Sequence, residues 1–509
     1  MTNKLYLILF GLLGYSVVSN AQYFEDALRF SQSNYSLGST ARIQAIGGAQ
    51  VALGGDISSA MSNPAGLGFF NKSVFVVTPS LDFINANTEF GIIRPNGLQT
   101  QGSEETFKNN FNFANIGTVI NFGKGRFTDD KFKGGSLAIS LSRNNTYHLS
   151  RSYEGENGFN SVVDNILQDA GNLSTNNLSE LGYAAYDQFL ITPVVDGNDN
   201  IQFYDAFVGG YPIQRETIKQ RGSHYQMNIA WGGNYDDKFY FGGGMGVQLL
   251  NYNQNRSYEE FDFLQGTEDL DSLNAIRIDD EIKVRGAGVN FNVGAIFRPV
   301  SFLTIGASYT SPSFMTFDEE SYIDLAADWD AGTTYTEDGT TFDLATIDPY
   351  QSDLFVNKYR LRTPSRVSVG AAAFIGKNGF LTGDLEFVDY SRANLNSDDF
   401  STASDNDVIN DSFNSVVNVR VGGEYRFDNF RLRAGYAIFP DPVKDSTLDD
   451  RTNITFGFGY RTFDYYLDFA VVSSSSQQQA VPYFITDNQP VANSDIRNTA
   501  VSVTFGLNF

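Results

Sequence analysis

From Ser73 to the end of the chain, short segments in which apolar and polar residues alternate are separated by polar, glycine-rich connections. Alternation with a period of two is typical of a β-strand that has one apolar and one polar face. The pattern predicts fourteen strands, near residues 73–83, 112–122, 134–151, 222–234, 238–253, 277–298, 302–312, 363–376, 380–390, 414–427, 430–440, 451–462, 464–474 and 497–509. An even number of antiparallel strands is what a closed β-barrel of a bacterial outer membrane requires.

The predicted connections alternate in length along the chain. Tight turns are expected at 234–238, 299–301, 377–379, 428–429 and 463, and a medium turn is expected at 123–133. Long loops are expected at 84–111, 152–221, 254–276, 313–362, 391–413, 441–450 and 475–496, the second of them with short helices at 161–170 and 178–190. This alternation puts every short turn on one rim and every long loop on the other, as in outer-membrane barrels, which have short periplasmic turns and long extracellular loops.

The two faces of the predicted strands differ in chemistry. In residues 417–427, valine, tyrosine and phenylalanine occupy one face, whereas asparagine, arginine and glutamate occupy the other. This pattern suits an apolar outer wall in lipid around a hydrated lumen. A soluble barrel with an apolar interior would show the same alternation, but the loop asymmetry and the N-terminal leader favour the membrane.

Both ends of the chain carry export features. Residues 1–21, MTNKLYLILFGLLGYSVVSNA, predict a cleaved secretory signal peptide, with Lys4 as the positive region and Ser19-Asn20-Ala21 as the cleavage site. The apolar run of about 14 residues is shorter than the roughly 20 that a membrane-spanning helix needs. The last residues, AVSVTFGLNF, alternate and end on Phe509. This ending is similar to the terminal strand that outer-membrane barrels present to the barrel-assembly machinery, which we expect as a partner.

The composition excludes several classes of protein. The chain has 48 glycines, 44 phenylalanines and 27 tyrosines, but only 2 histidines and no cysteine. Without cysteine there is no disulfide, no thiol nucleophile and no Cys-zinc site. The formal charge of −24 argues against nucleic-acid binding. We therefore expect no metal, no cofactor and no nucleic-acid partner.

Residues 47–70, GGAQVALGGDISSAMSNPAGLGFF, are too glycine-rich for a helix and too irregular for a strand. With its Gly-Gly-Ala, Gly-Gly-Asp and Asn-Pro-Ala-Gly motifs directly before the first strand, this stretch resembles the FadL/TodX family of outer-membrane transporters of hydrophobic compounds. The resemblance implies a fourteen-stranded barrel over residues 73–509, with residues 22–72 folded into the lumen as a hatch. The hatch residues are then Gly47, Gly48, Gly54, Gly55, Asn63, Pro64, Ala65 and Gly66.

The resemblance also implies a function, which is passive uptake of a hydrophobic ligand such as a long-chain fatty acid or an aromatic hydrocarbon. In the family the ligand leaves sideways through a gap at an inward kink in the third strand. In the predicted third strand, 134–151, Leu137, Ile139 and Leu141 form a regular outward face, and Arg143 and Asn145 then take outward positions. A bend at Arg143, Asn144 and Asn145 would open the wall; alternatively, the strand has simply reached the membrane interface.

The predicted loops contain aromatic residues that are candidates for ligand capture, namely Tyr186, Phe189, Phe261, Phe263, Phe314 and Phe317. Outer-membrane lipid and lipopolysaccharide are expected to surround the barrel, which we expect to be a monomer. Barrels with the same hatch and strand count also act in protein secretion or surface attachment, and other members are described as haemin receptors, so these functions remain alternatives. A hydrophilic porin is disfavoured by the hatch.

The chain is not expected to be an enzyme. An outer-membrane phospholipase needs a serine and a histidine on the lipid-facing wall, but the alternation places His148 and His224 on the inner face. A catalytic imidazole also needs a nucleophile and an orienting partner within hydrogen-bond reach. No metalloprotease, hydrolase or nucleotide-binding motif is present, and the run Gly242–Gly246 lies inside a predicted strand, where it indicates a bend or close contact with the hatch.

Overall fold

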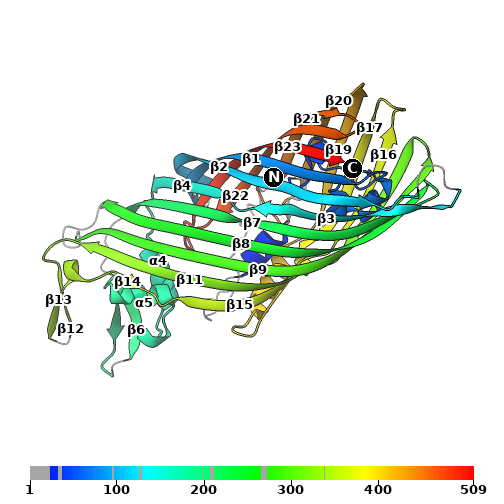
Figure 1. The fold of residues 1–509 in the computed structure, drawn as a ribbon. Coiled ribbons are helices and arrows are strands. Elements are labelled where there is room, and N and C mark those ends of the chain that lie inside the picture. The colour runs from blue at the N-terminus through cyan, green and yellow to red at the C-terminus, as the bar shows by residue number, and fades with distance from the viewer. Residues whose placement is uncertain are drawn as a thin grey trace, which may run out of the picture.

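In the computed structural model, the chain forms a closed antiparallel barrel in which the last strand pairs with the first (Figure 1). The structure describes residues 23–32, 37–94, 97–124, 129–198, 200–206, 211–264, 272–337 and 339–509, and the predicted signal peptide, 1–21, lies outside them. Among the described helices, none has the length and apolar character needed to cross a membrane.

The wall has the fourteen strands that the alternation predicts, and three of them are interrupted and counted in two parts. In chain order they are β1 (Val74–Arg94), β2 (Gly97–Asn121), β3 (Phe132–Thr146) with β4 (Leu149–Glu156), β7 (Tyr211–Tyr235), β8 (Phe239–Leu264), β9 (Leu273–Val300), β10 (Leu303–Thr310) with β11 (Phe314–Trp329), β15 (Phe355–Arg362) with β16 (Arg366–Phe374), β17 (Gly379–Asp389), β19 (Ser415–Phe427), β20 (Phe430–Phe439), β21 (Arg451–Arg461), β22 (Tyr465–Ala480) and β23 (Pro490–Asn508). The predicted fold class is therefore confirmed.

The remaining elements lie inside the barrel or beyond its long strands. The N-terminal part contains α1 (Phe24–Ser31), α2 (Ala41–Gln44), α3 (Ser59–Ser62) and η1 (Pro64–Phe69). The other elements are α4 (Val162–Ala170), η2 (Thr175–Asn177), α5 (Glu180–Asp187), β5 (Ile191–Val195), β6 (Ile201–Ala206), β12 (Thr334–Glu337), β13 (Thr340–Asp343), η3 (Leu344–Thr346), β14 (Tyr350–Gln351), η4 (Tyr390–Arg392), β18 (Asn394–Ser397) and α6 (Ala403–Ser412).

The barrel is taller on one side than on the other (Figure 1). Strands β7, β8 and β9 have 25, 26 and 28 residues, whereas β17, β20 and β21 have 11, 10 and 11. Because about 9–11 residues are enough to cross the membrane, the long strands continue beyond it. Large parts of the predicted loops 84–111, 254–276 and 313–362 are therefore strand, and the prediction of loops there was wrong.

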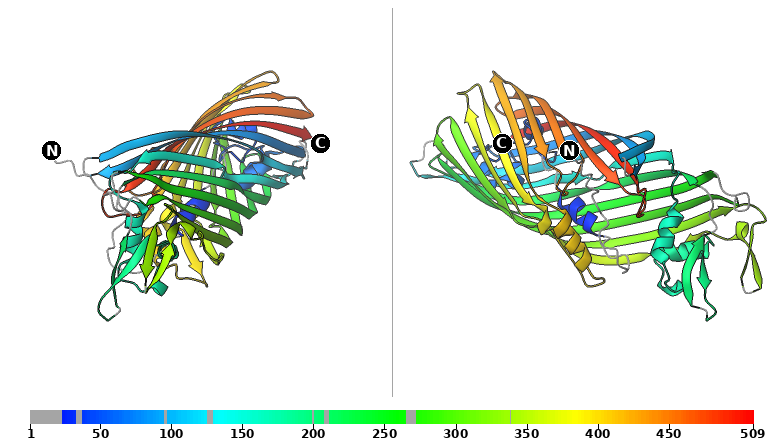
Figure 2. Two further views of the ribbon diagram at one scale, coloured as in Figure 1. Left: turned by 90° about the vertical axis from the view of Figure 1, so that its left-hand side faces the viewer. Right: turned by 180° about the vertical axis from the view of Figure 1, so that it is seen from behind.

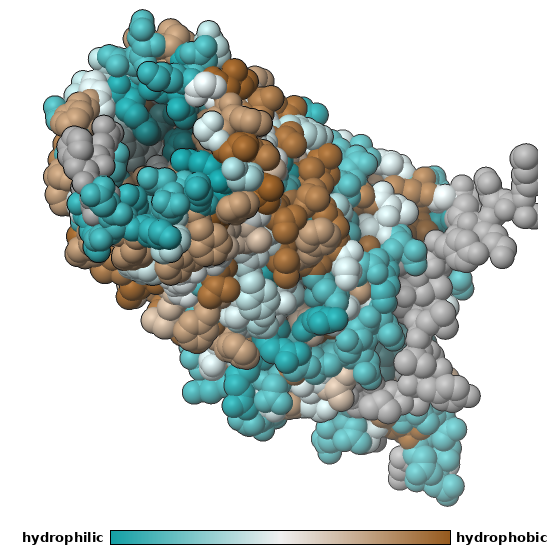
Figure 3. Space-filling view, turned by 90° about the vertical axis from the view of Figure 1, so that its right-hand side faces the viewer, coloured by the Kyte–Doolittle hydropathy of each residue, from teal (hydrophilic) through white to brown (hydrophobic). Residues whose placement is uncertain are grey.

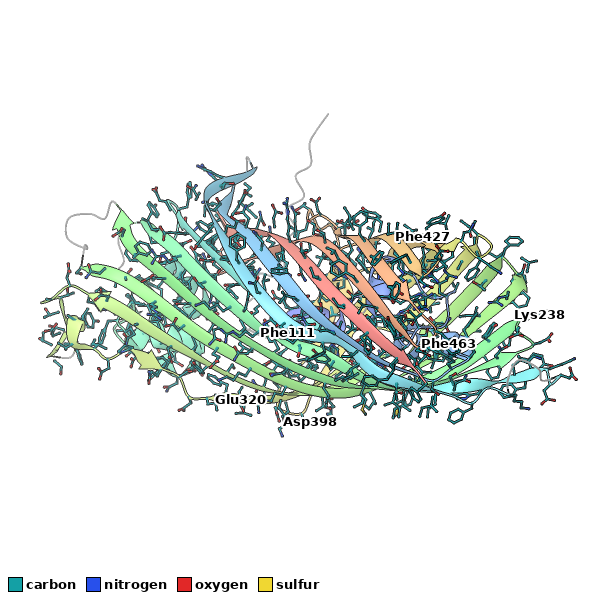
Figure 4. All side chains as sticks on the ribbon, turned by 45° about the horizontal axis from the view of Figure 1, so that its top comes forward. Phe111, Lys238, Glu320, Asp398, Phe427 and Phe463 are labelled. Atoms are coloured by element: carbon teal, nitrogen blue, oxygen red, sulfur yellow. The ribbon has the colours of Figure 1, made fainter. Side chains whose placement is uncertain are left out.

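The short connections gather at the other end, as predicted. β7 and β8 are joined through residues 236–238, β9 and β10 through 301–302, and β19 and β20 through 428–429. Figure 4 labels Lys238 and Phe427 at or beside the first and the last of these turns, and Phe463 in the turn between β21 and β22. Figure 3 shows this end as a hydrophilic rim around a hollow, with a hydrophobic band on the outer wall behind it. This is the periplasmic end of an outer-membrane barrel.

Candidate functional site

Residues 37–70, which we call the inner segment, lie inside the barrel and are almost entirely buried. Gly47, Gly48 and Gly55 have φ values of +69°, +81° and +71°, which side chains other than glycine rarely adopt. A Cβ atom on Gly54 would lie 2.1 Å from the Phe69 ring. The glycines at 47, 48, 54 and 55 therefore allow the chain to turn tightly within the lumen.

The wall contacts the inner segment through its own glycines. Seven inward-facing positions on β7, β8, β9, β10, β19, β20 and β21 leave no space for a side chain, because a Cβ there would lie between 1.9 and 2.5 Å from an atom of the inner segment: Gly232, Gly242, Gly294, Gly306, Gly422, Gly435 and Gly457. The predicted crowding at Gly242 is thus observed. The inner segment therefore packs directly on the backbone of half of the wall strands, mostly through its own backbone.

Buried hydrogen bonds add to this contact. Asp384 Oδ2 on β17 accepts from the backbone N–H groups of Gln50 (2.6 Å) and Val51 (2.9 Å). The Asn63 side chain donates to the Val51 carbonyl at 2.7 Å, and its Oδ1 accepts from Ala65 N at 3.2 Å. Pro64 then begins η1, so Asn63-Pro64-Ala65-Gly66 is a capped, buried turn between the inner segment and the first strand.

A layer of buried ion pairs lies near the periplasmic turns. Arg42 of the inner segment stands between Asp56 (3.9 Å) and Glu424 (3.8 Å). Glu424 pairs with Arg433 at 2.7 Å, and Arg433 pairs with Asp468 at 2.6 Å. Moving an apolar molecule through this layer would separate buried charges from their partners, which carries a large penalty.

On the extracellular side of the inner segment, helix α1 lies in the lumen among aromatic side chains. Phe30 is 1% exposed, and its ring stacks on Phe317 with centroids 5.1 Å apart. The rings of Tyr147 and Tyr252 lie edge-on to the Phe30 ring, with centroids 5.9 and 5.7 Å from its own. Tyr359 packs on Phe317 at 5.1 Å. We call these four wall residues, Tyr147, Tyr252, Phe317 and Tyr359, the aromatic cage.

Polar contacts hold α1 at both its start and its middle. Asp405 of α6 accepts hydrogen bonds from the backbone N–H groups of Tyr23 (2.8 Å) and Phe24 (3.0 Å), and the two helices lie side by side (Figure 2). The Tyr359 hydroxyl donates to Asp26 at 3.0 Å. The Tyr23 hydroxyl donates to Glu319 on β11 at 3.1 Å.

Glu319 lies beyond the membrane, because Asp318 and Glu320 on either side of it face outward and are exposed. Burial, together with the nearby Asp26 carboxylate, raises the pKa of Glu319 to about 7. Burial also raises the pKa of Asp26 above its ordinary value. Both carboxyl groups are therefore easier to protonate while α1 occupies this position than they are in water.

Of the six aromatic residues predicted to capture a ligand, only Phe317 belongs to the cage. Tyr186, Phe189 and Phe263 pack against the apolar cluster that joins α4 and α5 to the extracellular ends of β8, β9 and β11. Phe261 lies under the Arg215 guanidinium at 4.6 Å, and Phe314 is 55% exposed on the outer wall. The six residues are not brought together, because the segments predicted as loops are strands whose faces alternate.

The third strand loses its partner on one side, where the sequence predicted a break. β3 pairs with β2 from Ser136↔Asn121 to Ser142↔Asn115, and beyond this point β3 and β4 pair only with β7 among the described residues. A bulge between Arg143 and Asn145 marks the change. Beyond the bulge β4 still lies against β2, with Ser152 donating to Glu104 at 2.5 Å, but no ladder hydrogen bonds join the two strands in the part of the chain that the structure describes. We call this stretch without ladder pairing, between β2 and the outer half of the third strand, the wall gap.

The predicted outward position of Arg143 was wrong. Arg143 is 2% exposed and its Nη1 lies 2.6 Å from Asp82 Oδ2 on β1. Arg143 and Asn144 form the bulge, where two residues of β3 stand opposite one residue of β7, so the regular alternation of faces breaks at Arg143. Asn144 donates to Gln226 at 3.1 Å, and Asn145 donates to the Gln32 carbonyl at 3.5 Å.

The bulge also touches the inner segment, because a Cβ on Gly38 would lie 1.7 Å from the Arg143 carbonyl oxygen. His224 faces inward, as predicted, and its Nε2 lies 2.8 Å from Gln248 Oε1. No cluster of three or more metal-ligating side chains is found in the described part of the chain.

Comparison with known proteins gives a consistent result. A family model described as "Outer membrane protein transport protein (OMPP1/FadL/TodX)" matches residues 206–509. No curated protein matches the chain. Among solved structures it is similar to a FadL homologue from Pseudomonas aeruginosa, with a TM-score of 0.54 and 12% identity over 92% of this chain and 98% of that one. It is also similar to the toluene transporters TodX from Pseudomonas putida (TM-score 0.47, 12% identity, 92% and 98% covered) and TbuX from Ralstonia pickettii (0.46, 13%, 92% and 98%).

Proposed function

The chain belongs to the OMPP1/FadL/TodX family of outer membrane transport proteins, and from this premise we propose that it takes up hydrophobic compounds passively, by movement of a hatch and lateral release. It is a barrel of the Gram-negative outer membrane, and its family consists of transport channels rather than enzymes. The proposed ligands are long-chain fatty acids or aromatic hydrocarbons.

The observation that carries this proposal is the position of the aromatic cage beside the wall gap. Tyr147 connects β3 to β4, on the strand whose pairing with β2 has ended, and its ring contacts Phe30 of α1. A ligand that replaced Phe30 would enter an apolar site next to an interrupted wall. Release toward lipid would then avoid the ion-pair layer of Arg42, Glu424 and Arg433 below.

In the proposed cycle a ligand enters from the extracellular side and displaces α1 from the cage. The inner segment acts as the hatch, and its contact at Gly38 with the Arg143 backbone links it to the wall gap. The turns at Gly47, Gly48, Gly54 and Gly55 and the buried turn Asn63-Pro64-Ala65-Gly66 would set how far the hatch can move. The opening would lie at Arg143, Asn144 and Asn145.

A role in protein secretion or surface attachment is the second candidate, and the size of the extracellular part favours it. Helices α4 and α5 and the hairpin β5–β6 form a packed unit beyond the membrane, with Phe203 and Val195 exposed on the hairpin at 52% and 49%. An exposed hairpin of this kind offers strand edges and apolar side chains to a protein partner. Haemin binding has less support, because His224 is already bonded to Gln248.

Uptake into liposomes tests the transport proposal. The purified protein would be reconstituted and the entry of a radiolabelled long-chain fatty acid and of toluene measured, alongside a variant in which Phe30→Cys and Phe317→Cys are joined by a short bis-maleimide. The chain has no cysteine of its own, so only this link forms. We expect the linked protein to lose uptake and the unlinked double variant to retain it. Equal uptake by the linked and unlinked proteins would rule out this route, and capture of a protein partner without any uptake would favour secretion.

A further inference from the structure

Beside the wall gap the barrel carries three cations that have no acidic partner among the described residues. Lys219 and Arg221 face outward on β7 and are exposed. Lys108 of β2 reaches across the gap, and its Nζ donates to the Gln220 carbonyl at 2.8 Å. The Lys108 ammonium is close enough to Lys219 and Arg221 to be repelled by both.

This arrangement stands out in a chain with a net charge of −24. Several outward-facing cations elsewhere on the tall side of the wall are paired: Lys283 with Glu281 at 2.7 Å, Lys358 with Asp318 at 3.4 Å and Arg360 with Asp398 at 2.8 Å. Arg285 of β9 is exposed without an ion pair among the described residues, but it stands singly rather than in a group. The three cations at the gap repel one another and lack such a neighbour. Like charges that lie close together without a counter-charge repel one another, which raises the electrostatic free energy of the unbound protein. Binding of an anion from outside the chain lowers this free energy again.

The cations lie at the extracellular edge of the apolar outer wall. On β7 the outward residues change from Met227 and Tyr225 to Arg221 and Lys219 within a few positions. On β2, Phe107 and Phe111 are 71% and 64% exposed, and Figure 4 shows Phe111 on the outside of the barrel. Phe107 and Lys108 are consecutive, so their side chains leave β2 on opposite faces: Phe107 faces outward, and Lys108 turns toward β7.

We propose that this patch binds a phosphorylated glycolipid of the outer leaflet. The phosphate lies against Lys108, Lys219 and Arg221, and the acyl chains lie against Phe107 and Phe111. Phosphate is the chemistry that a group of lysine and arginine side chains at the edge of a membrane recognises, through short charge-assisted hydrogen bonds. The exposed phenyl rings explain why the anion is part of a lipid rather than a free ion.

The bound lipid would have a structural consequence at the gap. Its phosphate would neutralise the three cations, and its acyl chains would cover the outer edge of β2, which has no ladder partner there. The lipid would thus form part of the wall where β2 and β3 separate. This role does not depend on which compound the barrel transports.

Native mass spectrometry of the detergent-solubilised full chain tests the proposal, with diphosphorylated lipid A as the probe and its dephosphorylated form for comparison. The test variant is Lys219→Gln with Arg221→Gln. The control variant, Lys124→Gln with Lys238→Gln, removes two exposed lysines from the periplasmic turns. We expect binding of diphosphorylated lipid A to weaken by at least about tenfold in the test variant and to remain unchanged in the control.

A third variant, Phe107→Ser with Phe111→Ser, separates a lipid from a free anion. It should also bind lipid A more weakly, and inorganic phosphate should fail to displace the lipid. The heat-dependent gel shift of folded barrels would verify that each variant is assembled. Equal binding by the parent and the test variant, equal binding of the phosphorylated and dephosphorylated lipids, or full displacement by inorganic phosphate would overturn the proposal.

Discussion

The inner segment and helix α1 both lie within the barrel, but different forces hold them. The inner segment packs its backbone against glycines of the wall, so almost no side chain separates the two. Helix α1 is held by side chains, chiefly Phe30 in the aromatic cage and the hydroxyls of Tyr23 and Tyr359. Close backbone contact leaves no space for adjustment, whereas a side chain can be replaced by another group of similar shape.

Because different forces hold them, we assign the inner segment and helix α1 to different steps of the proposed cycle. Burial of Phe30 contributes roughly 1.5–3 kcal/mol, and each neutral hydrogen bond adds about 0.5–1.5 kcal/mol. A hydrophobic ligand can supply interactions of this size by taking the place of the phenyl ring. Helix α1 is therefore expected to leave first, while the inner segment shifts only afterwards.

The most severe test is to push the inner segment away from the wall. A Cβ on Gly422 would lie 2.3 Å from the Ile46 carbonyl oxygen, so Gly422→Val should force the inner segment out of place. Overpacking of this kind costs about 1–3 kcal/mol, which corresponds to a rise of about five- to 150-fold in the open fraction. Ion conductance in a planar bilayer would measure that rise.

Gly383→Val is the matched control. Gly383 lies on the neighbouring β17, and a Cβ there meets no atom closer than 3.6 Å. Its conductance should equal that of the parent. If Gly422→Val also conducted no more than the parent, the inner segment would not be what closes the lumen.

The second test concerns the point where the inner segment meets the bulged strand. Asp82→Asn would leave the buried Arg143 guanidinium without its ion pair, and such a change typically costs 3–5 kcal/mol of the free energy of unfolding. Asp318→Asn breaks an exposed pair with Lys358 and should cost less than about 1 kcal/mol. Urea unfolding followed by tryptophan fluorescence would measure both. Similar losses in the two variants would contradict a structural role for the buried pair.

The third test weakens the docking of α1 and leaves the inner segment unchanged. Phe30→Ala removes the ring from the aromatic cage, which weakens α1 docking by about 3–5 kcal/mol. Hydrogen exchange of residues 24–31 should become much faster, whereas exchange of residues 41–62 should change little. Phe314→Ala, a ring of the same type on the outer wall, should alter neither. If both segments exchanged faster together, they would move as one unit and the proposed order of steps would fail.

The sequence predicted the strands correctly within the membrane, where one face of each strand contacts lipid and the other faces the lumen. The strand count, the rim of short turns and the inward position of His224 follow from alternation within the apolar band. The outer halves of β1, β2 and β11 were missed, because beyond the membrane both faces of a strand contact water or polar groups and the alternation disappears. For example, GLQTQGSEETFKNN at the start of β2 has only two large apolar residues and no alternation.

The aromatic cage was missed for a different reason. Phe30, Tyr147, Tyr252, Phe317 and Tyr359 come from five segments that are far apart in sequence, and only the closure of the barrel brings them together. The bulge at Arg143 reversed the expected face of that residue for a local reason, which alternation alone does not reveal. Of the wall glycines, only the run Gly242–Gly246 was predicted to contact the hatch, because a run of glycines inside a strand marks a bend or a close approach of backbone.

The smallest expected effect is a dependence of α1 docking on pH. The pKa of Glu319 is about 7 with α1 docked and returns toward its ordinary value of 4.5 once α1 leaves. The docked state therefore binds more protons between these two values, so docking is strongest below about pH 4.5 and weakens as the pH rises to about 7. The buried Asp26 acts in the same direction, because burial raises its pKa too, and Arg29 beside it opposes part of that shift.

An environment-sensitive dye on Gln32→Cys, the only thiol in the chain, would report docking across this range. Glu319→Gln should remove the part of the curve that is due to Glu319, which is at most about 3 kcal/mol, and leave the part due to Asp26. A curve unchanged by this substitution would show that Glu319 does not hold α1, and the difference between the two inner parts would then rest on the aromatic cage alone.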